Sequence, residues 1–149
     1  MAALALAAAG WLVYTQWWGQ GGKHALAWRD LTPQLGNVEF TRRVTGVYHS
    51  RGSFSRMLEA TMPGRAPKPS PVDWAHDQVV VIALGPRSST GYSLRILRVT
   101  ERRRGIDVYA REVTPSLGEP VTARVTYPYR AFAMRRTTKP IFVKLQGRP

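Results

Sequence analysis

The pattern of apolar and polar positions in the second half of the chain is that of a β-protein. Residues 79–84 are wholly apolar and rich in β-branched side chains, which a strand requires when both of its faces are buried. Residues 92–96, 106–111 and 121–127 instead alternate apolar and polar positions with a period of two. The alternation changes phase at Leu97-Arg98, which predicts a β-bulge there.

Two further strands are predicted at residues 131–134 and 141–145. Glycine, proline and charged turns separate the strands at short, regular intervals, as in sandwiches and small barrels. The predicted fold is therefore mainly β, a single β-sandwich or partly open barrel of about six to seven strands with one short helix.

The elements before the central strand are predicted from shorter patterns. Residues 37–49 form a plausible strand with Arg42 and Arg43 pointing outward and a turn or bulge at Gly46. Ser53 is placed to cap a short helix over residues 54–60, whose apolar side chains fall on one face at helical spacing. In that helix, the face toward the core comprises Phe54, Met57 and Leu58.

The first residues of the chain have the composition of a membrane anchor. Residues 2–18 carry no charge and end in two tryptophans, and as a helix they would span about 26 Å, the lower limit for crossing a bilayer core. A signal peptide is the alternative, but no basic residue precedes the apolar run. The predicted organisation is an anchor or uncleaved signal with a glycine-rich hinge over 1–22, a linker over 23–36 and a β-rich domain over 37–149.

Charge gives two further indications. Lys23 and Arg29 follow the apolar run, so the positive-inside rule taken alone leaves the domain in the cytoplasm. The formal net charge is +13, from 22 Lys and Arg against 9 Asp and Glu, which predicts attraction to polyanions. Most of these cations are interpreted as the solvated faces of a sheet; anionic lipid stays a candidate partner, and nucleic acid is disfavoured.

Residue types that carry catalysis or bind metals are sparse. The chain has no cysteine, which excludes disulfides and thiolate chemistry. His24, His49 and His76 lack the spacing that would place two metal ligands on one face of an element. Asp73, His76 and Asp77 are interpreted as a polar turn entering the central strand. We therefore predict a protein that is not an enzyme and has neither a metal nor a cofactor.

Residues 86–92 form the most distinctive segment. Glycine, proline, serine and threonine follow the buried strand, so the chain must turn there into the next strand. In one interpretation the segment is only a tight connection, with Gly85 and Gly91 supplying unusual backbone dihedrals. In the other it is a rigid recognition loop anchored by Tyr92. The residues alone leave both open.

The order of these features resembles the PrcB C-terminal domain family, named after an accessory subunit of a bacterial protease complex. The matching features are the short helix at 54–58, Val72-Asp73-Trp74, the apolar strand ending at Gly85, Gly91-Tyr92-Ser93-Leu94, Thr126-Tyr127-Pro128-Tyr129 and Lys139-Pro140-Ile141-Phe142. The family usually has a second glycine where Thr90 stands. A local likeness of Thr90-Gly91-Tyr92 to chagasin-type protease inhibitors gives an alternative.

The resemblance implies a non-catalytic, extracytoplasmic domain that binds a protein partner, with an envelope protease as the candidate. Together with the anchor, it predicts a single-pass inner-membrane protein with a periplasmic domain. The candidate partner-binding residues are Arg87, Ser88, Ser89, Thr90, Gly91, Tyr92, Tyr127 and Tyr129.

Overall fold

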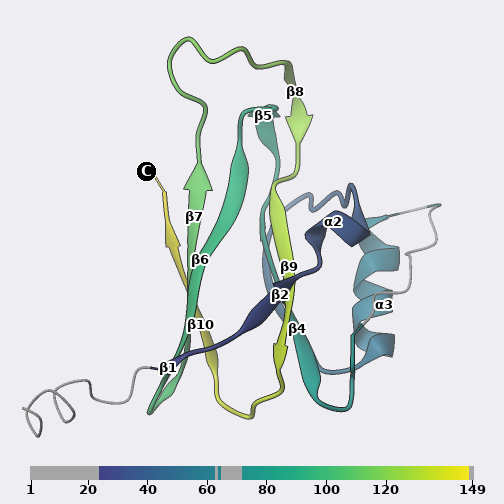
Figure 1. The fold of residues 1–149 in the computed structure, drawn as a ribbon. Coiled ribbons are helices and arrows are strands. Elements are labelled where there is room, and N and C mark those ends of the chain that lie inside the picture. The colour runs from purple at the N-terminus through teal and green to yellow at the C-terminus, as the bar shows by residue number, and fades with distance from the viewer. Residues whose placement is uncertain (1–23, 63, 65–71, 148–149) are drawn as a thin grey trace, which may run out of the picture.

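The computed structural model describes residues 24–62, 64 and 72–147, and it is mainly β (Figure 1). The predicted membrane segment at 2–18 lies outside these residues. Among the helices that the structure does describe, none has the length and apolar character needed to cross a bilayer.

In the described residues, ten strands form two four-stranded sheets and a two-stranded ribbon. Sheet A has the order β1-β6-β7-β10, sheet B has the order β2-β9-β4-β3, and β5 pairs with β8 in the ribbon. The elements are β1 (His24–Ala25), β2 (Trp28–Asp30), α2 (Thr32–Leu35), β3 (Arg43–Tyr48), α3 (Arg51–Thr61), β4 (Asp77–Leu84), β5 (Arg87–Ser89), β6 (Ser93–Arg102), β7 (Gly105–Val113), β8 (Ala123–Thr126), β9 (Tyr129–Arg135) and β10 (Ile141–Gln146).

Strand β4 lies at the centre of the fold, as its composition predicted. It pairs with β3 on one side and with β9 on the other, both antiparallel. Val79, Val81 and Ala83 enter one hydrophobic core, and the alternate residues 80, 82 and 84 enter a second. None of these six side chains is more than 4% exposed. The prediction of a strand buried on both faces is confirmed.

The two cores define three layers. Apolar side chains of sheets A and B pack face to face in one core, which includes Leu94 and Val108 of sheet A and Phe132 of sheet B. The other face of sheet B packs against α3 through Phe54 and Leu58. Sheet A, sheet B and α3 therefore follow one another across the molecule, with α3 on the side away from sheet A (Figure 1).

Residues 24–36, for which the sequence predicted a linker, are instead part of the sandwich. β1 pairs with β6 at the edge of sheet A, and β2 pairs with β9 at the edge of sheet B. Leu31 is completely buried, and Thr32 donates to and accepts from the backbone of Ala131. Strands of two and three residues are too short to show a period, which explains why the pattern did not reveal them.

The region before β4 also differs from the prediction in detail. β3 begins only at Arg43, and Gly46 lies within it in regular register with Val81, without a turn or bulge. A β-carbon on Gly46 would come within 2.6 Å of the Tyr48 hydroxyl, so the ring of Tyr48 occupies that space. α3 is capped by Ser50 rather than Ser53, because the Ser50 hydroxyl accepts a hydrogen bond from the Ser53 amide.

The prediction of mainly β structure is confirmed, and the predicted number of strands was too low. The bulge is where the phase change placed it, since the pairing of β6 with β7 shifts register between Ile96 and Arg98. Strand β10 pairs with β7 in parallel, which requires the chain to cross from sheet B to sheet A after β9. The sheets are open, and among the described strands they do not close into a barrel.

Candidate functional site

The predicted recognition segment forms one half of a ribbon that projects from an end of the sandwich. β5 pairs with β8, and the long β7–β8 connection passes over the ribbon at the top of Figure 1. The Thr90 amide donates to the Thr122 carbonyl at 3.1 Å, and the Thr122 amide donates to the Thr90 hydroxyl at 3.0 Å. The Thr126 hydroxyl donates to the Ser89 carbonyl at 2.7 Å. We call residues 86–92 and 114–126 together the apex.

Gly85 and Gly91 have different roles in the apex. Gly85 has a φ of 79°, so its predicted unusual dihedral is confirmed. Gly91 does not have a positive φ, and the corresponding prediction was wrong. A β-carbon at Gly91 would lie 2.6 Å from side-chain carbons of Pro115 and Val121. Gly91 therefore permits the β7–β8 connection to approach closely.

Arg87 is engaged within the fold. Its Nε donates to Glu112 Oε1 at 2.6 Å and its Nη2 to Glu112 Oε2 at 3.2 Å, while Nη1 donates to two nearby backbone carbonyls. The Arg87 side chain is 27% exposed and that of Glu112 is 13% exposed. The hydrogen bonds that Arg87 donates to Glu112 raise the pKa of Arg87 above its ordinary value. The pair joins the ribbon to β7.

Three of the predicted partner-binding residues are tyrosines, and the structure gives them different exposures. Tyr129 is buried: its hydroxyl donates to the Gly36 carbonyl at 2.6 Å, and its ring lies 5.4 Å from that of Phe40. Burial raises the pKa of Tyr129 to about 12. Tyr92 and Tyr127 are half-buried, and Tyr127 borders a pocket of about 270 Å³ between β8 and residues 37–39. Tyr129 is therefore a core residue.

Ser88, Ser89 and Thr90 lie together on the ribbon. Ser88 and Thr90 are exposed, whereas Ser89 is buried. The predicted set is thus brought to one end of the molecule, but only part of it is accessible. Whether its accessible members contact a partner stays a prediction.

The apex also exposes aliphatic side chains that the sequence did not single out. Leu117 is fully exposed, Val125 is 60% exposed and Val121 is 41% exposed. Val121 and Val125 are apolar positions of the period-two pattern over residues 121–127. Val125 is exposed because β8 belongs to the projecting ribbon, outside both sheets of the sandwich, and Val121 lies in the connection that precedes β8. The signal available in the sequence was the Pro- and Gly-containing segment 115–120, which precedes this strand.

The polar turn before β4 is as predicted. The Asp73 carboxylate lies 2.8 Å from His76 Nδ1, and both side chains are mostly exposed. The hydrogen bond with His76 lowers the pKa of Asp73. Within the described part of the chain, no three His, Asp or Glu side chains are grouped as metal ligands would be.

These observations define a small β-sandwich domain with a helix on one sheet and a projecting apex. The family model described as PrcB C-terminal matches residues 78–135, which run from β4 to the end of β9 and include the whole apex. The resemblance to that family is confirmed. No curated protein and no solved structure matches the chain.

Proposed function

We propose that this chain is a non-catalytic accessory module that binds a protease of the bacterial cell envelope through its apex. The observation that carries the proposal is the exposure of Leu117, Val121 and Val125 in the apex. Three of the five large apolar side chains that are exposed in the described residues lie in the apex, and such a concentration is typical of protein-interaction sites. The family match supports an accessory role in a protease complex.

The apex is suited to binding because it is held rigidly. The Arg87–Glu112 pair ties β5 to β7, and the hydrogen bonds of Thr90 and Thr126 tie β5 to β8. A surface ordered before binding loses less conformational entropy when the partner arrives. The same packing disfavours the chagasin-like alternative, because Gly91 lies against Pro115 and Val121 rather than at a free loop tip.

Two further parts of the proposal rest on the sequence. Residues 2–18 would anchor the chain in the inner membrane, and the domain would lie on the periplasmic side. The uncharged apolar run supports the anchor. The resemblance to an extracytoplasmic family supports the orientation.

The test is affinity capture of the full chain from its native membranes, with the recovered proteins quantified. The variant is Leu117→Asp with Val125→Asp, which places two charges on the proposed contact surface. The control is Gly52→Asp, which places a charge at an exposed position of α3 where an added β-carbon would have nothing within 4 Å. Because all three residues are exposed, their replacement is expected to change stability by no more than about 0.5 kcal/mol.

We expect one protease at constant stoichiometry with the unmodified chain and with Gly52→Asp, and at least tenfold less of it with the apex variant. A charge in the centre of an interface costs about 2 kcal/mol or more, which exceeds the roughly 1.4 kcal/mol of a tenfold ratio. Equal recovery with the apex variant would show that the apex is not the contact. Absence of any protease from the capture would refute the accessory role.

A further inference from the structure

The outer face of sheet A is basic and uncovered by the described residues. Sheet B has α3 on its outer side, whereas sheet A has no such layer (Figure 1). The alternate positions of β6, β7 and β10 point away from the sandwich core. The outer face comprises Arg95, Leu97, Arg98, Arg102, Asp107, Tyr109, Arg111, Phe142 and Lys144. Five cations thus share the face with one carboxylate, whose side chain is only 6% exposed.

Two of these cations are directly opposed. Arg95 on β6 pairs in register with Arg111 on β7. Like charges opposite one another across a sheet destabilise it. Among the described residues no carboxylate forms an ion pair with either arginine, and Arg111 donates only to the neutral side chain of Gln146. A bound anion would offset this repulsion.

The opposed arginines border a groove that could receive such an anion. The groove has a volume of about 730 Å³ and lies between the end of sheet A and residues 114–117. Leu97 and Leu117 line it and are both exposed. The carboxylate that lines the groove, that of Glu112, is already paired with Arg87. The groove therefore combines unpaired cations with exposed aliphatic carbon.

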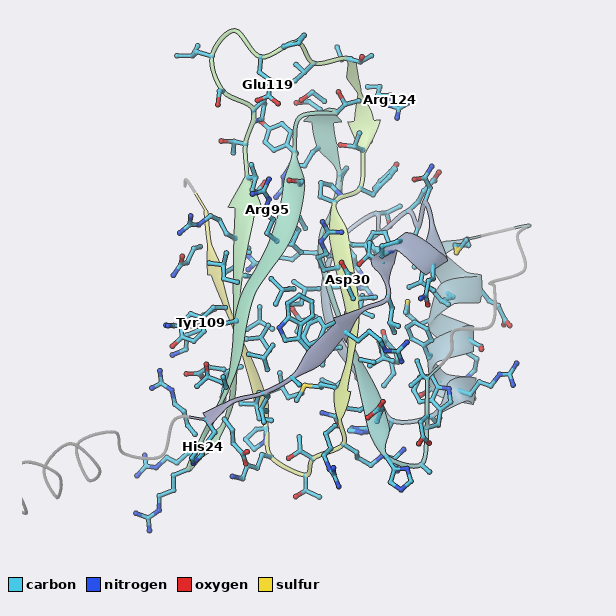
Figure 2. The ribbon with its side chains drawn as sticks, in the orientation of Figure 1. His24, Asp30, Arg95, Tyr109, Glu119 and Arg124 are labelled. Carbon is cyan, nitrogen blue, oxygen red and sulfur yellow. The ribbon has the colours of Figure 1, made fainter. Side chains whose placement is uncertain are left out.

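The remaining cations are arranged around Tyr109, which lies on the side of sheet A away from sheet B (Figure 2). The Arg98 guanidinium lies 4.1 Å from the centre of the Tyr109 ring, and Lys144 Nζ lies 5.8 Å from it. Arg102 donates to the Tyr109 hydroxyl at 2.7 Å. These contacts hold the cations on the face, next to the exposed ring of Phe142.

The attachment of the chain places this face near the anchor. β1 forms the edge of sheet A and begins at His24, so only residues 19–23 separate it from the end of the apolar run. Five extended residues reach at most about 18 Å. If residues 2–18 are in the bilayer, the edge of sheet A lies within that distance of the headgroups.

We propose that the outer face of sheet A docks on the anionic headgroups of the bilayer, with Arg95 and Arg111 binding lipid phosphates and Leu97 and Phe142 facing the acyl boundary. Basic residues with flanking apolar side chains are the composition that such surfaces bind. The inference rests on the anchoring part of the proposed function and is independent of the protein partner.

The test uses the full chain in vesicles of phosphatidylcholine with or without phosphatidylglycerol. Because the chain has no cysteine, Leu97→Cys and Arg56→Cys each provide a single position for a fluorophore, one on the outer face and one on α3. Quenching by a nitroxide on the lipid headgroup reports which label lies at the bilayer. Flotation with vesicles of phosphatidylcholine alone reports the anchor separately, so failure of the anchor and failure of the face are distinguishable.

We expect the label at residue 97 to be quenched and the label at residue 56 not to be. The quenching at residue 97 should require phosphatidylglycerol, and high salt should reverse it. Arg95→Gln with Arg111→Gln should lower the ratio of docked to undocked domain roughly 25-fold, about fivefold for each cation near an anionic surface. The matched control, Arg51→Gln with Arg56→Gln on α3, removes the same charge and should leave the ratio unchanged.

Equal quenching of the two labels, quenching without phosphatidylglycerol, or no quenching at residue 97 would each overturn the proposal. So would a response of the residue 97 label to a single-stranded oligonucleotide but not to anionic vesicles, which would assign the face to nucleic acid.

Discussion

Replacement of Tyr129 by Phe tests whether this residue belongs to the core or to a contact surface. The change removes only the hydroxyl and keeps the ring that packs on Phe40. That hydroxyl donates to the Gly36 carbonyl at 2.6 Å, and the side chain is buried. Loss of one buried hydrogen bond costs about 1 kcal/mol. We therefore expect Tyr129→Phe to lower the free energy of unfolding by about 1 kcal/mol at pH 8.

The difference in the free energy of unfolding between the unmodified protein and Tyr129→Phe should disappear at alkaline pH. Burial raises the pKa of folded Tyr129 to about 12, compared with an ordinary value of 10.0. A raised pKa means that the folded state holds the proton more tightly, so this contribution to stability is complete below pH 10 and is lost as the pH rises toward 12. The unmodified protein should lose about 1.4 kcal/mol from this group by pH 11. The variant lacks the group, and all other titrations cancel in the comparison.

The measurement is urea-induced unfolding of the full chain in detergent, followed by tryptophan fluorescence at pH 8 and pH 11. A gap of about 1 kcal/mol at pH 8 that closes near pH 11 supports the buried hydroxyl. A gap that stays constant over this range would refute it. Tyr129→Phe should not affect capture of the protein partner. If the variant no longer captured the partner, Tyr129 would belong to the contact surface.

Three further substitutions test the packing of the apex and of α3. Gly91→Ala should lower the melting temperature because its β-carbon would lie 2.6 Å from two neighbouring side chains. The control, Gly52→Ala on α3, has nothing within 4 Å of the added β-carbon and should stabilise the protein by up to about 1 kcal/mol. Equal effects of the two substitutions would contradict the close approach at Gly91. Arg87→Ala should destabilise by about 1–3 kcal/mol because it leaves Glu112 without its partner. A double-mutant cycle with Glu112→Ala that shows no coupling would exclude the ion pair as the cause. Ser50→Ala should cost about 1 kcal/mol by removing the cap of α3, and an unchanged unfolding curve would argue against the cap.

The sequence predicted the parts of the fold that have a long, unambiguous period. Eight residues of β4 are enough to show burial on both faces, and the phase change in β6 correctly located its bulge. β1, β2 and β5 have two or three residues each, too few for any period to be read. Their pairing depends on partners far along the chain, such as Glu101 and Met134, which the local sequence does not identify.

The candidate site was predicted in place but not in detail. The sequence selected Gly91 correctly as an unusual position, but its glycine serves close packing rather than backbone geometry. The period-two pattern of residues 121–127 correctly indicated a strand. It could not show that β8 pairs outside the sandwich, where Val125 is exposed. Periodicity reports which residues share a face and does not report what covers that face.

The two proposed surfaces constrain each other through their places on the domain. β1 lies at one end of sheet A and the apex at the opposite end, with His24 and Arg124 marking these ends in Figure 2. The ten residues of β6 extend about 33 Å between them. If sheet A lies flat on the bilayer, the apex is held at the membrane surface. If the domain is attached only by the anchor, the apex can lie about 33 Å or more above the membrane surface. Docking of the basic face would therefore set the height at which a partner can be bound, and it favours a protease whose contact site lies next to the headgroups.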